Sequence, residues 1–336
     1  MRVSYSAIST YNECGEKYRL ERVEKLTPYE IPAPFVIGSV FDKVSGILFD
    51  SFKEGATPVS LEDLTKTLNT EFEFYSDGKD EEGNEIKIHT ILSDKIKFPK
   101  SDIDLTLLKE SDYPLIHNLA NNYGVLKVTA NLDDISAFVD IVQGSDYEVN
   151  YDYYRLYKHI SYIAVLRKLE VMIEHLYKWT VENVEKVVST QKEIRQLDEN
   201  GNEFVGYIDV ELILKGEDFV RTMDVKTARN PKQQYPDNHI EESLQLHLYA
   251  NWSNSKVGYI VINKNIPKKE STRNSNMVRI LLGEATDEGI EDALEYVNES
   301  IEKISQGIYE KNFNNCTKYG GCTYYDICHG KEVIIE

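Results

Sequence analysis

Residues 206–226 read GYIDVELILKGEDFVRTMDVK, and this stretch decides the core of the fold. Two β-branched and apolar runs, VELIL and FVRTM, flank the polar turn KGED at 215–218, a pattern typical of a β-hairpin with a short loop. Asp209 comes early in the first strand, and Asp224 and Lys226 stand two positions apart near the end of the second. The stretch therefore predicts a hairpin that carries two carboxylates and one ammonium group.

The strand period predicts how these groups face one another. Side chains two positions apart point to the same face of a sheet, so Asp224 and Lys226 project side by side. If the hairpin register places Asp209 across from Asp224, two carboxylates converge, and a divalent cation relieves their repulsion. Mg²⁺ takes oxygen ligands of this kind and keeps waters and substrate phosphate in its other positions. The alternative interpretation of Asp-x-Lys is a solvated strand end with a surface ion pair.

Length and charge limit the classes of protein. The 336 residues suit one large domain or one domain with a sizeable insertion. No apolar run is long enough for a membrane helix, and the N-terminus does not resemble a signal peptide, so we expect a cytoplasmic protein without a membrane partner. The 57 acidic residues exceed the 38 basic ones and give a formal net charge of −19. Any contact with nucleic acid must therefore be local, through a basic groove or a metal that captures phosphate.

Four cysteines are the second group of interest: Cys14, Cys316, Cys322 and Cys328. In a cytoplasmic chain they indicate metal binding, redox chemistry or simple burial rather than disulfides. The last three follow one another at intervals of six within a loop-rich tail, and the C-x₂-C pairs typical of structural zinc are missing. Four thiolates at irregular separation suit an iron–sulfur cluster, whereas coincidental burial of all four remains the alternative.

The rest of the chain reads mainly as helices and strands around the hairpin. Amphipathic helices are predicted from Gly38 onward, over 155–179 and over 241–252. Asp42 is the exceptional polar residue of the first helix. Residues 184–195 alternate as a strand does, and a turn is predicted at 198–201. Residues 53–150 read as a mainly helical insertion. Tyrosines ahead of the long helix form either a base-stacking cluster or core packing, and they are Tyr147, Tyr151, Tyr153, Tyr154 and Tyr157.

With these pieces placed, the chain resembles the PD-(D/E)xK nuclease superfamily, in the RecB-like branch that includes CRISPR-adaptation exonucleases and iron–sulfur helicase–nuclease subunits. The matching motifs run in the family's order. They are S-x-S-x-I-x-x-Y-x-x-C at 4–14, G-x-x-x-D at 38–42, G-x-x-D at 206–209, D-x-K at 224–226, Q-L-x-x-Y at 245–249, and the three terminal cysteines. The chain departs from the family in having Asp42 where histidine is usual and Gly15 where proline is usual. The resemblance does not extend over 53–150.

The resemblance implies roles for individual residues. Asp209, Asp224, the backbone carbonyl of Val225 and Asp42 would bind Mg²⁺ or Mn²⁺, and Lys226 would orient the attacking water. Gln245 and Tyr249 would position Lys226 or the DNA strand, with Glu193 a weaker candidate for the same cluster. The four cysteines would hold a [4Fe–4S] cluster that joins the two ends of the chain. Asp42 puts the metal preference in question, because an all-oxygen site suits Mg²⁺ better than one with an imidazole.

The implied fold is α/β (α+β), a small mixed sheet flanked by helices, formed by one nuclease domain over 1–336 with the helical insertion at 53–150 and a cluster module at 14 and 316–328. The predicted function is a metal-dependent DNA nuclease, an exonuclease on single-stranded ends in replication, recombination, repair or phage-type DNA processing, with a helicase or recombination protein as a possible partner. The alternative from another class is a nucleic-acid-binding subunit without activity. The intact Asp209, Asp224 and Lys226 argue against it, and the cysteine spacing argues against a zinc-stabilised structural protein.

Overall fold

The computed structural model describes residues 1–26, 31–72, 75–79, 85–89, 96–98, 103–125, 131–144, 151–197, 201–253, 256–316 and 322–330. The chain forms two compact units. Unit 1 comprises Met1–Tyr29, Gly46–Pro58 and Leu176–Glu336, and unit 2 comprises Glu30–Ser45 and Val59–His175. Two helices, α3 (Ala33–Asp50) and α7 (Tyr151–Asn183), contribute residues to both units.

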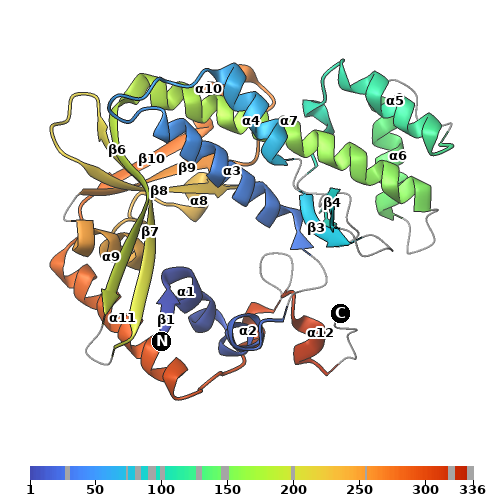
Figure 1. Cartoon of the computed structure of the whole chain (residues 1–336). Helices are drawn as coiled ribbons and strands as arrows, with labels where there is room; N and C mark the ends of the chain where they lie inside the picture. The colour runs from blue at the N-terminus through green and yellow to red at the C-terminus, as the bar shows by residue number, and fades with distance from the viewer. Residues whose placement is uncertain are drawn as a thin grey trace. The chain divides into compact units, whose positions relative to one another are not determined.

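Unit 1 is built around a mixed sheet of six strands with helices packed on it (Figure 1). The strands are β1 (Arg2–Ser4), β6 (Val184–Leu197), β7 (Glu203–Leu214), β8 (Arg221–Ala228), β9 (Lys256–Asn263) and β10 (Val278–Gly283). The helices are α1 (Tyr5–Glu13), α2 (Gly15–Tyr18), a π-helical turn (Arg19–Val23), α8 (Pro231–Gln234), α9 (Leu244–Ser253), α10 (Glu270–Asn276), α11 (Asp287–Ser305), a 3₁₀ turn (Phe313–Asn315) and α12 (Tyr325–Cys328). This arrangement confirms the predicted mixed sheet with flanking helices.

The strand order of the sheet is β1-β7-β8-β9-β10, with β6 paired to β7. The pairs β1–β7 and β8–β9 are parallel, and β6–β7, β7–β8 and β9–β10 are antiparallel. The predicted hairpin is present as β7 and β8. Its turn is closed by the Glu217 N–H, which donates to the Leu214 carbonyl at 3.0 Å, and Gly216 takes the left-handed conformation that the turn requires, with φ of 83°. Of the predicted turn at 198–201, residues 198–200 lie outside the described residues.

Helix α9 is the apolar link between the sheet and α11. Leu246 packs with Ile208 and Val261 of the sheet, whereas Leu248 packs with Ala293 and Val297 of α11. A helix that is apolar on opposite sides is buried between two layers, so α9 holds its remaining polar residues at fixed positions against β8 and β9.

The N-terminal helices and the C-terminal tail lie together in unit 1 (Figure 1). The Tyr11 hydroxyl donates to the Ile308 carbonyl at 2.7 Å, and the Glu16 N–H donates to the Glu310 carbonyl at 3.2 Å. Gly15 sits where the two segments meet, since a Cβ at this position would lie 2.7 Å from the Glu310 backbone nitrogen. Glycine at position 15, where the family usually has proline, therefore allows the backbone near Glu310 to approach closely.

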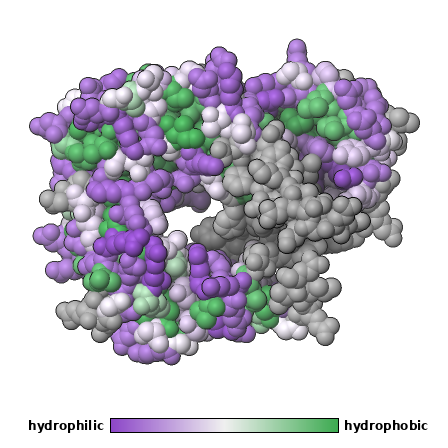
Figure 2. Space-filling view, in the orientation of Figure 1, coloured by the Kyte–Doolittle hydropathy of each residue, from purple (hydrophilic) through white to green (hydrophobic). Residues whose placement is uncertain are grey.

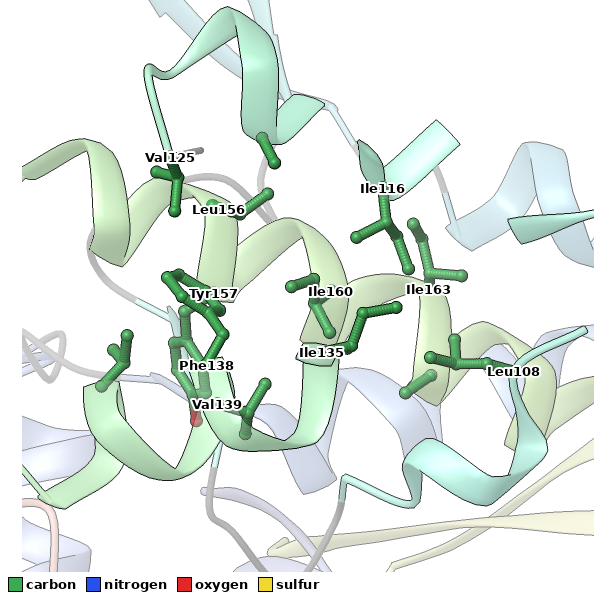
Figure 3. Packing of buried hydrophobic residues seen from close by; sticks show 13 residues of the cluster. Leu108, Ile116, Val125, Ile135, Phe138, Val139, Leu156, Tyr157, Ile160 and Ile163 are labelled. Atoms are coloured by element: carbon green, nitrogen blue, oxygen red, sulfur yellow. The ribbon is translucent and has the colours of Figure 1, made fainter. Parts of the chain in front are cut away.

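The described part of unit 2 is mainly helical and has its own apolar core (Figure 3). Its elements besides parts of α3 and α7 are β2 (Ile31–Pro32), α4 (Leu61–Phe72), β3 (Tyr75–Lys79), β4 (Glu85–His89), β5 (Ile96–Lys97), a 3₁₀ turn (Leu105–Leu107), α5 (Asp112–Asn122) and α6 (Leu132–Gly144). Helix α3 begins at Ala33, five residues before the start at Gly38 that the sequence predicted, and it includes Pro34. Proline is tolerated there because the first turn of a helix lacks N–H partners in any case.

The predicted tyrosine cluster mostly serves this core. Tyr157 is buried, and Tyr153 and Tyr154 are partly buried against the same apolar residues. Tyr151 is 58% exposed, with the Arg155 guanidinium 5.2 Å from its ring centroid. Tyr147 lies outside the described residues. Core packing is therefore the correct interpretation for the three described tyrosines other than Tyr151.

Hydrophilic residues predominate on the face that Figure 2 shows, with hydrophobic residues in small separate groups. None of the helices among the described residues is long and apolar enough to cross a bilayer.

Candidate active site and cysteine group

The hairpin register brings the two predicted carboxylates together. Val210 pairs with Met223 and Glu211 with Thr222, so the same register sets Asp209 opposite Asp224. The backbone pairing of β7 with β8 ends at Val210 and Met223. Beyond it the Asp209 side chain takes the place of a backbone acceptor, because its Oδ2 accepts a hydrogen bond from the Val225 N–H at 2.8 Å. A side chain that takes a backbone donor of the next strand is held in one orientation, which fixes Asp209 beside Asp224.

Asp224 is a buried carboxylate, with an exposed fraction of 1%. Its Oδ1 accepts a hydrogen bond from Gln245 Nε2 at 3.1 Å. Its Oδ2 lies 2.7 Å from the Lys226 ammonium nitrogen, yet the contact lacks hydrogen-bond geometry and the atom has no hydrogen-bond partner within the described chain. The solvated strand end considered above is therefore wrong for Asp224, because a buried carboxylate requires compensation that an exposed one does not.

The Lys226 ammonium interacts with both carboxylates. Burial lowers the pKa of its ammonium group, but the charges of Asp224 and Asp209 outweigh burial and hold this pKa above its ordinary value. The side chain is 33% exposed, so the group faces the carboxylates and remains accessible from solvent. The site thus presents one cation between two anions at an accessible surface of the sheet.

Gln245 and Tyr249 lie one turn apart on α9, on the face directed to the site. Besides its bond to Asp224, Gln245 Nε2 donates to the Tyr249 hydroxyl at 2.9 Å. Tyr249 is 3% exposed, and burial, followed by the Asp224 charge, raises the pKa of its hydroxyl. The spacing of four residues that the sequence shows is therefore a physical contact, and both residues reach the carboxylates from the helix side.

Sequence reasoning missed three residues near the site: Tyr259, Ser243 and Tyr5. Tyr259 on β9 stands in register with Asp224, and its hydroxyl contacts the Ser243 hydroxyl at 2.5 Å. The pKa of Tyr5, from α1, is raised to about 12 by burial and next by Tyr296, and the charges of Lys226 and Asp224 also act on it. A tyrosine within the apolar run GYIVIN is a weak signal, because only the parallel pairing of β8 with β9 places it beside Asp224.

The residues present fit a divalent cation bound to oxygen. Asp224 has a buried anionic oxygen without a hydrogen bond, and Asp209, whose Oδ2 accepts from the Val225 N–H, stands opposite it. Among the described residues no three His, Cys, Asp or Glu side chains are gathered for a metal. A site with two carboxylates suits Mg²⁺, which commonly binds one or two carboxylates together with waters and substrate phosphate.

Two other predicted site residues are not brought to these carboxylates by any described contact. Glu193 lies in an ion-pair group with Arg2 and Arg195, at 3.2 Å and 2.9 Å, and about a third of its side chain is exposed. Asp42 is exposed on α3, in the part of that helix that belongs to unit 2. Its role as a metal ligand stays a prediction.

The four cysteines all belong to unit 1, and Cys14 and Cys322 act electrostatically on both Cys316 and Cys328. Burial raises the pKa of the Cys316 thiol, followed by the charges of Cys322 and Cys14. Burial also raises the pKa of Cys328, followed by Glu16 and then Cys322. The Cys322 N–H donates to the Cys316 carbonyl at 2.8 Å, and the Asn312 N–H contacts Cys14 Sγ at 3.5 Å. The thiols are thus near one another, although they are not closed around a metal-sized centre.

Gln245→Leu should lower the rate of any chemistry at this site by tenfold to about a hundredfold. The substitution removes a hydrogen bond to a buried carboxylate, and hydrogen bonds to charged groups contribute about 1.5–3 kcal/mol. Turnover and metal affinity should be measured together, because Asp224 loses the donor that orients it. Gln143→Leu is the matched control, since Gln143 donates in the same way to Tyr157 within unit 2. Equal effects of the two substitutions would contradict a positioning role for Gln245.

Comparison with known proteins gives one match over most of the chain. The sequence model of the PD-(D/E)XK nuclease superfamily matches residues 114–329, a range that includes Asp209, Asp224, Lys226 and the three C-terminal cysteines. No curated protein matches the chain.

Nineteen chains of solved structures match. One of them, "Crystal structure of SSO0001", is 18% identical, and the match covers 59% of this chain and 95% of that one. Its TM-score of 0.31 is too low to establish a common fold.

Proposed function

Because the chain belongs to the PD-(D/E)XK nuclease superfamily, which implies a metal-dependent nuclease, we propose that it hydrolyses phosphodiester bonds of DNA, as an exonuclease on single-stranded ends. The observation that carries the proposal is the pairing of Asp209 with Asp224 beside Lys226, in which the buried Asp224 Oδ2 has no hydrogen bond. A divalent cation would give this oxygen a second positive partner besides the Lys226 ammonium, which lies 2.7 Å away.

The chain's own residues divide the work. Asp209, Asp224 and the Val225 carbonyl would hold the cation. A bound Mg²⁺ or Mn²⁺ supplies a water of lowered pKa and neutralises charge on the scissile phosphate. Lys226 would orient the attacking water and stabilise the developing negative charge, since its ammonium lies beside Asp224 and stays partly accessible to solvent. Gln245 holds Asp224 at the required angle, and Tyr249 holds Gln245.

We also propose that Cys14, Cys316, Cys322 and Cys328 hold one [4Fe–4S] cluster. The support is that four partly buried thiols from unit 1 include two, Cys14 and Cys322, that act electrostatically on the other two, Cys316 and Cys328. A bound cluster would link Cys14 to the C-terminal cysteines, next to hydrogen bonds that already join these two segments. Its role in this arrangement is structural.

The wider organisation follows from the same proposal. Residues 53–150 would be an insertion into a single nuclease domain over 1–336, and the part of this range from Val59 onward belongs to unit 2. The activity belongs to replication, recombination or repair of DNA, with a helicase or recombination protein as the partner that supplies single-stranded ends.

The decisive experiment is cleavage of end-labelled single- and double-stranded DNA by anaerobically purified protein, with and without Mg²⁺ or Mn²⁺. Release of mononucleotides from single-stranded ends, only with metal, is the expected result. Binding of DNA without cleavage under all metal conditions would contradict the nuclease proposal and support a non-catalytic DNA-binding subunit. Internal cuts in circular single-stranded DNA would replace the exonuclease by an endonuclease.

Asp42 tests the identity of the metal. If Asp42 is a ligand, Mg²⁺ should support activity nearly as well as Mn²⁺, since the site then contains only oxygen ligands. Asp42→His should shift the preference toward Mn²⁺, because imidazole suits the softer cation, and Asp42→Ala should remove most of the activity. Metal titrations of the three proteins on one single-stranded substrate make the comparison.

Asp133→His is the control for Asp42→His, because Asp133 is likewise an exposed helical aspartate of unit 2. Identical titration curves for all these proteins would remove Asp42 from the site and leave Asp209, Asp224 and Lys226 in place.

A further inference from the structure

Basic residues gather in the two loops that follow β8 and β9, in a chain whose net charge is −19. The basic residues lie in the first part of each loop, at 229–234 and 264–273, where the only acidic residue is Glu270, and Asp237, Glu241 and Glu242 follow later in the first loop. We call the basic residues of these two segments the basic edge, which consists of Arg229, Lys232, Lys264, Lys268, Lys269 and Arg273. The local charge is therefore opposite in sign to that of the whole chain.

Strand pairing brings the two loops to one place. Strands β8 and β9 are parallel and adjacent (Figure 1), and Ala228 pairs with Asn263 at their ends. The Lys264 N–H donates to the Ala228 carbonyl at 2.7 Å, which ties the start of the second loop to the end of the first strand. Parallel strands end at the same edge of a sheet, so segments more than 30 residues apart in sequence form one surface.

The second loop has a defined shape. Arg273 Nε donates to the Pro267 carbonyl at 2.6 Å, which folds α10 back toward the loop. Lys268 and Lys269 lie between these two anchors and are exposed. A loop that is fixed at both ends presents its lysines at reproducible positions, although the lysine side chains themselves stay in solvent.

Three lysines of the basic edge have no carboxylate partner in the part of the chain that the structure describes. Lys232, Lys268 and Lys269 are exposed and form no ion pair with any residue that the structure describes. Basic residues nearby are neutralised instead: Arg279 lies 2.6 Å from Asp237, and Lys256 lies 2.6 Å from Glu284. Unneutralised ammonium groups on an acidic body produce a local positive potential that attracts anions.

The basic edge adjoins the carboxylate site along β8. Lys226 precedes the end of the strand at Ala228 by two residues, which at about 3.3 Å per residue is about 7 Å. Phosphates of one DNA strand follow one another about every 3.4 Å along the helix axis, and farther apart when the strand is extended. A strand whose scissile phosphate lies at Lys226 therefore has its next few phosphates above these loops.

We propose that Lys232, Lys268 and Lys269 bind the phosphates of the single DNA strand on one side of the scissile bond. This inference rests on the proposed function for its substrate, and it adds the surface that holds that substrate. Ammonium groups without ion-pair partners suit phosphate contacts, because binding releases counterions and requires no protein ion pair to break. The contacts carry no sequence information, so the strand is held without base preference.

Salt dependence of binding tests the basic edge. A fluorescent single-stranded oligonucleotide is titrated without added metal, in the Asp224→Asn background, over a series of NaCl concentrations. For single strands, log K falls by about 0.7 per phosphate contact for each decade of salt. The triple variant Lys232→Gln, Lys268→Gln, Lys269→Gln should therefore lower the magnitude of the slope by about 2.

A charge-matched triple variant provides the control: Lys186→Gln, Lys215→Gln, Lys303→Gln. Lys215 lies in the β7–β8 turn, at the opposite end of β8, and the change in net charge is the same. The control should keep the parent slope. Equal slopes for the two triples would overturn the basic edge. If the parent cleaves no DNA but the two slopes still differ, the nuclease proposal fails and the basic edge stands.

Discussion

Asp224→Asn and Lys226→Gln should each abolish DNA cleavage while the chain stays folded. An asparagine side chain at position 224 would keep the oxygen that accepts from Gln245 but would lose the charge that binds the cation, and Lys226→Gln removes the ammonium group that lies beside both carboxylates. Loss of one preorganised charged group at a transition state lowers the rate by about a hundredfold or more. The measurement is single-turnover cleavage of end-labelled single-stranded DNA with saturating Mg²⁺.

The two variants should differ in stability. Asp224→Asn removes repulsion with Asp209, so its melting temperature should equal or exceed that of the parent. Lys226→Gln leaves a buried carboxylate without its cation, which is destabilising, so its melting temperature should be lower. Lys192→Gln is the control, because Lys192 pairs with the buried Glu211 at 2.9 Å on the same sheet. Undiminished cleavage by either site variant would contradict the assignment of the active site.

Cys14→Ser should remove iron from the protein and destabilise the whole of unit 1. In the proposed cluster, Cys14 is the sole N-terminal ligand, so its loss opens a loop of about 300 residues. The loop-closure relation (3/2)RT ln n makes that closure worth about 5 kcal/mol against the unfolded chain. Iron content, visible absorption and the melting temperature of anaerobically prepared protein should fall together.

The remaining contacts between the two segments limit the destabilisation that Cys14→Ser can cause. The Tyr324 hydroxyl donates to the Leu26 carbonyl at 2.8 Å, and Tyr11 bonds to Ile308, so the variant should keep a folded sheet at low temperature. Asp224→Asn, which retains all four thiols, is the control and should keep its iron. A colourless, zinc-containing and fully active parent protein would contradict the cluster.

The sequence predicted the hairpin because its information is local. Two apolar runs joined by KGED admit one pairing with a short turn, and the strand period then places Asp224 and Lys226 on one face. The i, i+4 spacing of Gln245 and Tyr249 similarly predicts neighbours on a helix, and the structure confirms their contact. Periodicity and turn chemistry act within a few residues, so they can be read before the chain is folded.

Other features needed contacts between distant segments. The burial of Asp224 depends on α9 being packed between the sheet and α11, and the place of Tyr259 depends on the parallel pairing of β8 with β9. The start of α3 at Ala33 was also missed, because a proline in a first helical turn resembles a loop signal.

The sequence by itself determined which groups this protein has for chemistry: Asp209, Asp224 and Lys226 on one hairpin, and cysteines at both ends of the chain. Only the tertiary structure decided their surroundings. It buries Asp224, joins the chain ends at Gly15, and unites the loops after β8 and β9 into the basic edge. The physical reason is that desolvation and surface potential depend on which segments meet in space, and residues far apart in sequence contribute to both.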